Sequence, residues 1–403
     1  MHPALSPTPI IDLAVAFWGA KTLLSAVELD LFTTLAAGPL DREALVARLH
    51  LHPRAARDFL DALVALGMLT RTGETYANTP ETDAFLVRGK PEYVGDYLDM
   101  LNTRLYPFWG ALTEALRTGQ PQNEAKHGGD LFGAIYGTPE RLRRFVQSMT
   151  GLTLATARAI AQHFPWAHYR TFIDLGTAQG ALPVQVALAH PHIRGGGFDL
   201  PAVQPHFDTY VQGFGLAERL RFFPGDFFTD PLPAAEVYAM GRVLHDWDLA
   251  TKRQLIAKVF DALPPGGAFL VHEALIDDDR RQHAYGLLMS LNMLIADFRG
   301  AKLAHSSPMP CSLSQGVWVI CLPFCEDISQ LKARNTPCVF WGQSRPMQRP
   351  LRSQASGHAS AHPTVALHAG VCNNSAQWPG RTAKMPHTAE SSRCRIAFTV
   401  DSS

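Results

Sequence analysis

The chain has 403 residues, of which 46% are hydrophobic and 18% charged, and its formal net charge is zero. A chain of this length usually forms more than one domain, and the balanced charge gives no argument for a nucleic-acid or acidic-membrane partner. No uninterrupted apolar run reaches the roughly 18 to 20 residues that span a bilayer. Met1 to Pro9 lack the pattern of a signal peptide, so we expect a cytoplasmic protein without a membrane partner.

The two ends of the chain differ in composition. All six cysteines lie after residue 300, between Cys311 and Cys394. Residues 301–403 contain 10 Lys and Arg against 4 Asp and Glu, a net charge of +6, and the first 300 residues hold the other 26 and 32, a net charge of −6. Two different compositions are therefore joined near residue 300.

Residues 10–100 have the pattern of a small helical domain with one hairpin. Apolar spacing over residues 13–24 predicts a helix. Asp41 can cap a second helix, and Pro53 begins a third, which Gly67 ends. Two short runs within residues 68–78 read as a β-wing. These elements together predict a winged helix, which either binds DNA or dimerises.

The charges on the helix that begins at Pro53 favour dimerisation. Its exposed cations are Arg54 and Arg57, and the nearby Asp58 and Asp61 balance them. A helix that binds in a DNA groove normally carries a basic stripe. We therefore expect no nucleic-acid partner and interpret residues 10–100 as a dimerisation domain.

Residues 101–165 are again helical in pattern and rich in aromatic side chains. We expect most of these side chains to form a core between helices and some to line a pocket for an aromatic substrate. They include Tyr106, Phe108, Trp109, Phe132, Tyr136 and Phe145.

From residue 170, short apolar runs alternate with helical stretches. Such alternation predicts an α/β domain with a parallel sheet and helices on both faces. The predicted strands are 170–175, 196–200, 220–223, 236–240 and 268–273, and the helices between them include 181–189, 202–213 and 250–263.

A glycine turn follows the first of these strands. It reads DLGTAQG over residues 174–180. Glycines there let the backbone approach a ligand closely, and ligands of doubly wound sheets bind at the carboxyl ends of the strands. The G-x-G-x-x-G fingerprint of nicotinamide enzymes is absent. Asp174, just before the first glycine, favours the methyltransferase form of this turn.

The second and third strands also end in polar residues. Asp199 can accept hydrogen bonds from both ribose hydroxyls of an adenosine, or it can cap the helix after Pro201. Asp226 can accept a hydrogen bond from an adenine amino group and Phe227 can stack on the ring. The alternative for residues 225–228 is a turn with buried aromatics.

His245, Asp246 and Trp247 follow the fourth strand. A neutral histidine can take a proton from a phenol or enol, whose oxygen then attacks a sulfonium methyl group. Asp246 is adjacent in sequence, so we expect its side chain to point elsewhere. Glu273 ends the fifth strand at the same sheet edge and is the expected orienting acid.

Several stretches together resemble the plant caffeate and flavonoid O-methyltransferase family, with its bacterial relatives and the hydroxyindole (acetylserotonin) O-methyltransferases. In chain order they are FIDLGTAQGAL, FDLPAV, GDFF, RVLHDWD and LPPGGAFLVHEALI. The run LFGAIYGTPERLRRFVQSM and the winged helix extend the resemblance over residues 10–295.

The resemblance implies an S-adenosyl-L-methionine-dependent enzyme with a Rossmann-like sheet and no metal. His245 matches the general base of the family and Glu273 an acid that flanks it. Family members form an intertwined homodimer through the N-terminal domain, and Leu287, Met289, Asn292 and Met293 fall where they line the acceptor site. The residues that match cofactor contacts are Tyr136, Gly176, Asp199, Gly225, Asp226, Phe227 and Arg242.

The chain departs from the family pattern in the glycine turn, where Ala178 replaces a central glycine. We expect its added methyl group to weaken cofactor binding without abolishing it. The larger departure follows Ile295, where the family continues with a helix and two antiparallel strands that complete the sheet. Only residues 316–324 read as a strand or buried segment there.

Three interpretations of this atypical tail remain: a shifted reading frame or aberrant splice, a disordered regulatory tail, or a metal site that uses Cys321 and Cys325. We expect a dimerisation domain over 10–100, a helical pocket-lining linker over 101–165, a methyltransferase domain lacking its last two strands over 166–298, and an irregular tail over 299–403. The predicted activity is methyl transfer to a hydroxyl of a small aromatic or polyketide-like molecule. The alternative is an inactive, truncated homologue that still dimerises.

Overall fold

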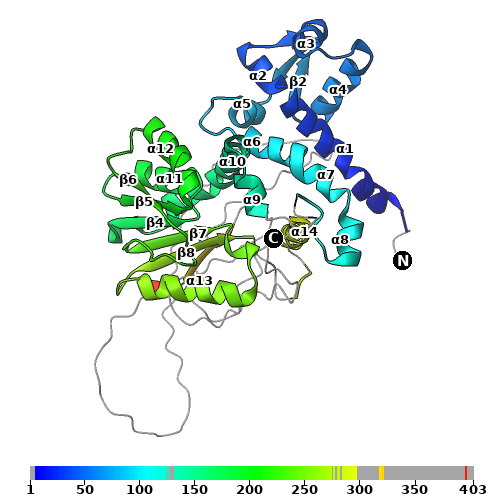
Figure 1. Cartoon of the computed structure of the whole chain (residues 1–403). Coiled ribbons are helices and arrows are strands. Elements are labelled where there is room, and N and C mark those ends of the chain that lie inside the picture. Colours follow the sequence, from blue (N-terminus) through cyan, green and yellow to red (C-terminus); the bar gives the residue numbers. More distant parts are fainter. Residues whose placement is uncertain are drawn as a thin grey trace, which may run out of the picture.

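The computed structural model describes residues 5–124, 126, 131–274, 276, 279–281, 284–296, 317–321 and 395–396. Most of the tail over 299–403 therefore lies outside the described residues, and so does Cys325 of the considered metal site. The chain forms an N-terminal unit, a set of connecting helices and an α/β unit (Figure 1).

The N-terminal unit confirms the predicted helices and hairpin. Its elements are α1 (Thr8–Glu28), α2 (Leu31–Thr34), η1 (Leu35–Ala37), β1 (Leu40–Asp41), α3 (Arg42–Leu49), α4 (Pro53–Ala65), β2 (Leu69–Thr72), β3 (Thr75–Asn78) and α5 (Pro80–Leu86). Asp41 caps α3 as predicted, because its carboxylate accepts a hydrogen bond of 2.8 Å from the Ala44 amide. The short strand β1 pairs antiparallel with β3 and was not predicted.

The first helix corrects the expectation that no apolar stretch of the chain is long enough to span a bilayer. By length and composition, α1 is the one described helix that is long and apolar enough to cross a membrane, and 17% of its apolar window is buried. Asp12 and Lys21 interrupt the run of apolar letters but leave its mean hydropathy high. Large apolar side chains such as Leu13 and Trp18 lie exposed along this helix.

Six further elements connect the two units and carry the aromatic residues of 101–165. They are α6 (Gly95–Met100), η2 (Leu101–Leu105), α7 (Tyr106–Trp109), α8 (Leu112–Thr118), α9 (Leu131–Tyr136) and the long α10 (Pro139–His163). Helix α10 contacts both α6 and α11, so it joins the connecting helices to the α/β unit (Figure 1).

The α/β unit confirms the predicted parallel sheet. Its five main strands are β4 (Thr171–Leu175), β5 (Arg194–Asp199), β6 (Leu220–Pro224), β7 (Val237–Gly241) and β8 (Ala268–Glu273), in the spatial order β8-β7-β4-β5-β6. The chain begins this sheet at β4, adds β5 and β6 on one side, and then returns to add β7 and β8 on the other. The strand order therefore reverses between β4 and β7, which is where ligands of such sheets bind.

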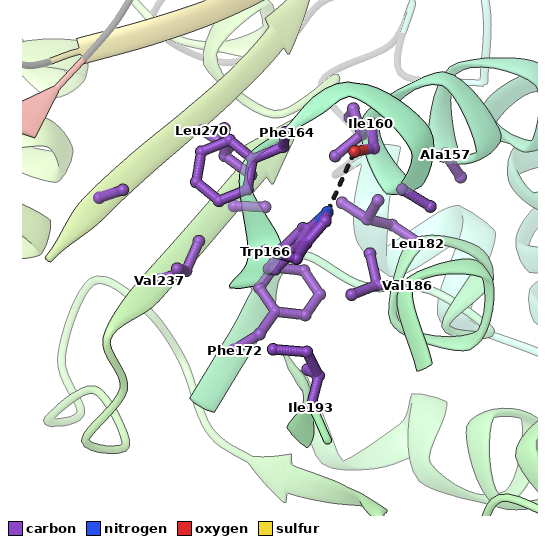
Figure 2. Close-up of a cluster of buried hydrophobic side chains, with 13 residues drawn as sticks. Ala157, Ile160, Phe164, Trp166, Phe172, Leu182, Val186, Ile193, Val237 and Leu270 are labelled. Carbon is purple, nitrogen blue, oxygen red and sulfur yellow. Dashed lines mark hydrogen bonds between the residues drawn. The ribbon is translucent and has the colours of Figure 1, made fainter. Parts of the chain in front are cut away.

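Helices cover both faces of the sheet. On one face lie α10, α11 (Ala181–Ala189) and α12 (Gln204–Gly213), which follows η4 (Pro201–Val203); α13 (Leu249–Ala262) lies on the other. Figure 2 shows the core beneath α10 and α11, where the Trp166 indole of η3 (Trp166–His168) donates a hydrogen bond of 3.1 Å to the Ile160 carbonyl. Burial of the Trp166 and Phe172 rings fixes α10 against the amino-terminal part of β4.

The far edge of β8 is paired, although the sequence predicts a domain that lacks its last two strands. Strand β9 (Val317–Cys321) pairs parallel with β8, from Phe269 opposite Val317 to Glu273 opposite Cys321. Strand β10 (Arg395–Ile396) pairs parallel with the first two residues of β8. The strand predicted within 316–324 is thus confirmed over 317–321. No antiparallel pair completes this sheet in the part of the chain that the structure describes. Helix α14 (Ala284–Ala296) contacts α7, α8 and η5 (Leu244–Asp246).

Candidate active site

The glycine turn between β4 and α11 forms the floor of the site. Gly176 has a φ of 75°, and a Cβ there would lie 2.7 Å from the Val243 side chain, so this position requires glycine. Ala178 also lies in the left-handed region, with a φ of 50°. The turn therefore keeps its place at the end of β4 with alanine at residue 178, but the backbone of Ala178 is strained because an L-residue rarely adopts the left-handed conformation.

Asp199 does not cap the helix after Pro201, because η4 has Leu200 at its N-cap and no side-chain cap hydrogen bond. Of the two roles considered, ribose binding stays a prediction. The Oδ1 atom of Asp199 accepts a hydrogen bond of 2.8 Å from the Leu200 amide, and its Oδ2 accepts one of 2.9 Å from the Ala178 amide. Burial raises the pKa of this carboxyl to about 6. Each oxygen keeps a second acceptor position, so Asp199 ties the two turns together and can still accept from a ribose.

The turn after β6 places aromatic rings at the same sheet edge. The Gly225 amide donates a hydrogen bond of 2.9 Å to the Asp199 carbonyl, which fixes this turn against β5. Asp226 accepts a hydrogen bond of 2.8 Å from the Phe228 amide. Phe227 packs edge-on against Phe228, with ring centroids 4.8 Å apart. The turn is present, but its aromatic side chains are not fully buried: Phe227 is partly buried and Phe228 is 41% exposed. The turn also faces a cavity.

A cavity of about 310 Å³ lies above these turns, between the sheet edge and helices α9 and α10. All seven residues predicted to contact the cofactor line it: Tyr136, Gly176, Asp199, Gly225, Asp226, Phe227 and Arg242. The sequence analysis missed other lining residues, among them Thr150, Thr153, Thr177 and His272. The threonines carry no distinctive sequence signal, whereas His272 is a polar residue within the apolar strand β8.

His245 lies beside the cavity, in the turn after β7, and Glu273 holds its ring. The Nδ1 atom of His245 is 2.5 Å from Oε2 of Glu273. The other oxygen of Glu273 accepts hydrogen bonds from the amides of Val243 and Leu244, at 3.0 and 2.8 Å. The carboxylate is therefore fixed by the backbone of the turn that carries the histidine, and it fixes the histidine in turn.

Asp246 does not point away from His245, and that expectation is wrong. Its Oδ1 atom lies 3.2 Å from Nε2 of His245, because both residues belong to the single turn of η5. Burial raises the pKa of Asp246 to about 7, although the positive charge of His245 opposes this shift. Burial lowers the pKa of His245, but the Glu273 and Asp246 carboxylates raise it more, so the net shift is upward.

The residues expected to line an acceptor site lie on α14. Asn292 accepts a hydrogen bond of 2.9 Å from the Trp109 indole, which links α14 to α7. Leu287, Met289 and Met293 are partly buried on the same helix. Helix α14 contacts η5, and η5 carries His245. None of these four residues lines the cavity described above.

Comparison with known proteins gives two domain matches: an O-methyltransferase dimerisation domain over residues 11–88 and an O-methyltransferase domain over residues 109–305. The chain is 48% identical over 295 residues to the tetracenomycin polyketide synthesis 8-O-methyl transferase of Streptomyces glaucescens, a match that covers 73% of this chain and 86% of the relative. It is 40% identical to an N,N-dimethyltransferase of Streptomyces rimosus, over 72% of this chain and 85% of the relative.

Among solved structures, the human N-acetylserotonin methyltransferase in complex with S-adenosylmethionine is similar, with a TM-score of 0.66 and 32% identity. The match covers 73% of this chain and 88% of that chain. Residues 11–88 are thus a dimerisation domain, and the domain that follows acts on a small-molecule acceptor. The chain belongs to the O-methyltransferase family that uses S-adenosyl-L-methionine as its methyl donor.

Proposed function

We propose that His245 is the general base of the methyl transfer and that Glu273 orients it. The observation that carries this proposal is the 2.5 Å contact between Nδ1 of His245 and Oε2 of Glu273. A carboxylate at Nδ1 keeps the proton on that nitrogen, so Nε2 is left to take a proton from an acceptor hydroxyl. Because the backbone amides of Val243 and Leu244 hold Glu273, the ring is oriented before any acceptor binds.

Asp246 sets a condition for this step. Its Oδ1 lies 3.2 Å from Nε2 of His245. An acceptor hydroxyl must therefore replace Asp246 beside Nε2 before the proton can move.

The residues around the cavity fit the cofactor. Asp199 can accept from the ribose, and Asp226 and Phe227 can contact the adenine ring at the same sheet edge. Buried side-chain atoms that have no hydrogen-bond partner among the described residues, such as Arg242 Nε, provide further hydrogen-bonding capacity. The bound cofactor supplies a methyl group on a positively charged sulfur, and the protein positions the acceptor oxygen toward it.

The acceptor that we propose is a small aromatic or polyketide-like molecule with a free hydroxyl. Support comes from the Streptomyces glaucescens relative, which acts in polyketide synthesis, and from the aromatic residues of α7 near α14. The Streptomyces rimosus relative is an N,N-dimethyltransferase. Nitrogen is therefore the competing acceptor atom, and the test below includes it.

The test incubates the purified chain with methyl-labelled S-adenosyl-L-methionine and matched polycyclic phenols and anilines. We expect label on the phenols only. His245→Ala should reduce transfer by about 10²- to 10⁴-fold, with cofactor affinity unchanged, since His245 does not line the cavity. Cofactor binding without any transfer would instead support the inactive, truncated homologue, and preferred labelling of anilines would replace the hydroxyl assignment.

We also propose that the protein is a cytoplasmic homodimer joined through its N-terminal unit. The exposed apolar side chains of α1, among them Leu13, Phe17 and Trp18, provide the surface that a second copy would cover. Light scattering should give twice the chain mass for the unmodified protein, and Trp18→Glu should shift it toward the monomer. A monomeric unmodified protein would contradict the assignment, and partition into detergent would favour a membrane role for α1.

A further inference from the structure

His272 is a buried histidine that the proposed reaction does not use. It lies at the end of β8, next to Glu273, and only 3% of its surface is exposed. Its ring covers the backbone of Gly241, where an added Cβ would lie 1.8 Å from the ring atom Cε1. The chain thus makes room for this imidazole by having glycine on the neighbouring strand.

The Nδ1 atom of His272 has no hydrogen-bond partner among the described residues, although it is buried. Other histidines of the same unit are satisfied: Nε2 of His190 lies 2.7 Å from the Ala161 carbonyl, and Nε2 of His192 lies 3.1 Å from the Trp166 carbonyl. Each unsatisfied buried polar group deserves an explanation, and His272 lines the cofactor cavity. A ligand in that cavity is the available partner.

The strand order identifies which part of the ligand reaches His272. Asp199 follows β5 and Asp226 follows β6, so the adenosine occupies that end of the cavity, as proposed above. Strands β4 and β7 lie between this end and β8, which carries His272. The amino-acid end of the cofactor therefore extends toward Arg242 and His272.

This end of the cavity has the chemistry of an amino-acid site. Nε of Arg242 is buried, has no hydrogen-bond partner in the part of the chain that the structure describes, and can donate to a carboxylate. Burial, reinforced by the positive charge of Arg242, lowers the pKa of His272 to about 4. The imidazole is therefore neutral, so it can accept a hydrogen bond from a cation without repelling it.

We infer that His272 is a cofactor-binding residue whose imidazole accepts a hydrogen bond from the α-ammonium of the methionyl group, while Nε of Arg242 donates to its carboxylate. The inference rests on the proposed placement of the adenosine at Asp199 and Asp226. Asp246 is the competing acceptor, because it also lines this cavity and its buried Oδ1, although 3.2 Å from Nε2 of His245, makes no hydrogen bond with any described residue.

The test measures dissociation constants by calorimetry for His272→Val and for three ligands that differ only at this end. They are S-adenosylhomocysteine, decarboxylated S-adenosylhomocysteine, which keeps the ammonium, and 5′-methylthioadenosine, which has no amino-acid end. We expect His272→Val to weaken the first two by about 10-fold or more, the range for a hydrogen bond to a charged group. Binding of 5′-methylthioadenosine should change by less than about 2-fold. His190→Gln, at a histidine outside the cavity, should alter none of the three constants.

Each outcome bears on a separate claim. Equal weakening of all three ligands would mean that His272 only shapes the pocket, and would overturn the inference. Unchanged binding of S-adenosylhomocysteine would overturn it as well, and a loss confined to Asp246→Asn would assign the ammonium to Asp246. Failure of the unmodified chain to bind 5′-methylthioadenosine would refute the adenosine placement itself, since that ligand does not reach His272.

Discussion

Ala178 is the position where the glycine turn departs from its family, and its replacement by glycine tests how the turn bears the difference. Ala178 has a φ of 50°, in the left-handed region. Its amide donates to Asp199, and its side chain lines the cavity and packs against the core that contains Phe207. The strain is thus held by a hydrogen bond and by packing, and it lies at the wall of the proposed cofactor cavity.

The expected magnitude follows from two opposing effects. A left-handed conformation costs an L-residue about 1 to 2 kcal/mol, and Ala178→Gly removes that cost from the folded chain. Glycine also increases the conformational entropy of the unfolded chain, which opposes folding by about 0.4 to 1 kcal/mol. The net gain in the free energy of unfolding therefore lies between about 0 and 1.6 kcal/mol, centred near 0.8 kcal/mol, if the turn keeps this conformation without a bound cofactor.

The same strain affects cofactor affinity only if the unliganded turn relaxes. If Ala178 leaves the left-handed region when the cavity is empty, the strain returns on binding, and Ala178→Gly should tighten S-adenosylhomocysteine by about 5- to 30-fold, the equivalent of 1 to 2 kcal/mol. If the hydrogen bond to Asp199 holds the turn in both states, the gain appears in stability. Urea unfolding measures the effect of the strain on stability, and calorimetry on the same preparation measures its effect on cofactor affinity.

The matched control is Ala181→Gly, three residues further along the chain. Ala181 also lines the cavity but belongs to the first turn of α11, where glycine should lower stability by about 0.5 to 1 kcal/mol. Opposite signs at residues 178 and 181 would identify the backbone conformation as the cause. An Ala178→Gly variant that is neither more stable nor tighter in binding would refute the reasoning.

Three further predictions concern the sheet edge. Glu273→Gln should lower kcat by about 10²- to 10⁴-fold. It should also shift the acidic limb of the pH–rate profile to lower pH, because the Glu273 carboxylate raises the pKa of His245. An acidic limb at an unchanged pH would exclude His245 as the titrating base. Gly241→Ala should destabilise the fold by about 1 to 3 kcal/mol in urea unfolding, since the new Cβ meets the His272 ring, and adding His272→Ala should restore most of the loss. Burial raises the pKa of Asp174 to about 8, so the folded chain holds this proton more tightly than the unfolded chain and loses stability as pH rises from about 4 to 8. Asp174→Asn should therefore raise the Tm of the unliganded protein more at pH 8 than at pH 5, and an equal rise at both would contradict the assignment.

The position of the site was predictable because parallel strands bring their carboxyl ends to one edge. The short apolar runs located all five main strands, and the residues that follow them, from Gly176 to Arg242, line one cavity. Sequence separation is irrelevant to this argument once the strands are placed. The same reasoning brought Glu273 beside His245, although 28 residues separate them.

The local geometry of the base was not predictable from those rules. We expected Asp246 to point away from His245, because consecutive residues on a strand face opposite sides. The chain leaves the strand at Gly241, however, and Arg242 adopts a φ of 56° before the single turn of η5. Within such a tight turn consecutive side chains can approach each other, and Asp246 reaches Nε2 of His245.

His272 had a signal in the sequence that the motif comparison left unused. All six residues of the strand AFLVHE are buried, and His272 is the polar residue just before Glu273, the acid that the motif identifies. A polar side chain at the carboxyl end of such a strand points either into a core, where it needs a protein partner, or toward a ligand. Only the structure shows which of the two directions the His272 side chain takes, because the space for its ring depends on Gly241 of the neighbouring strand.

Strand β8 therefore serves the two parts of the proposed reaction from its two faces. Side chains alternate along a strand, so His272 faces the cofactor cavity beneath α10 while Glu273, the next residue, faces the turn that carries His245. A small displacement of this strand end would change cofactor contacts and base orientation together. The pairing of β9 with Phe269 to Glu273 then matters for function as well as for stability, because it holds the outer edge of the one strand on which both depend.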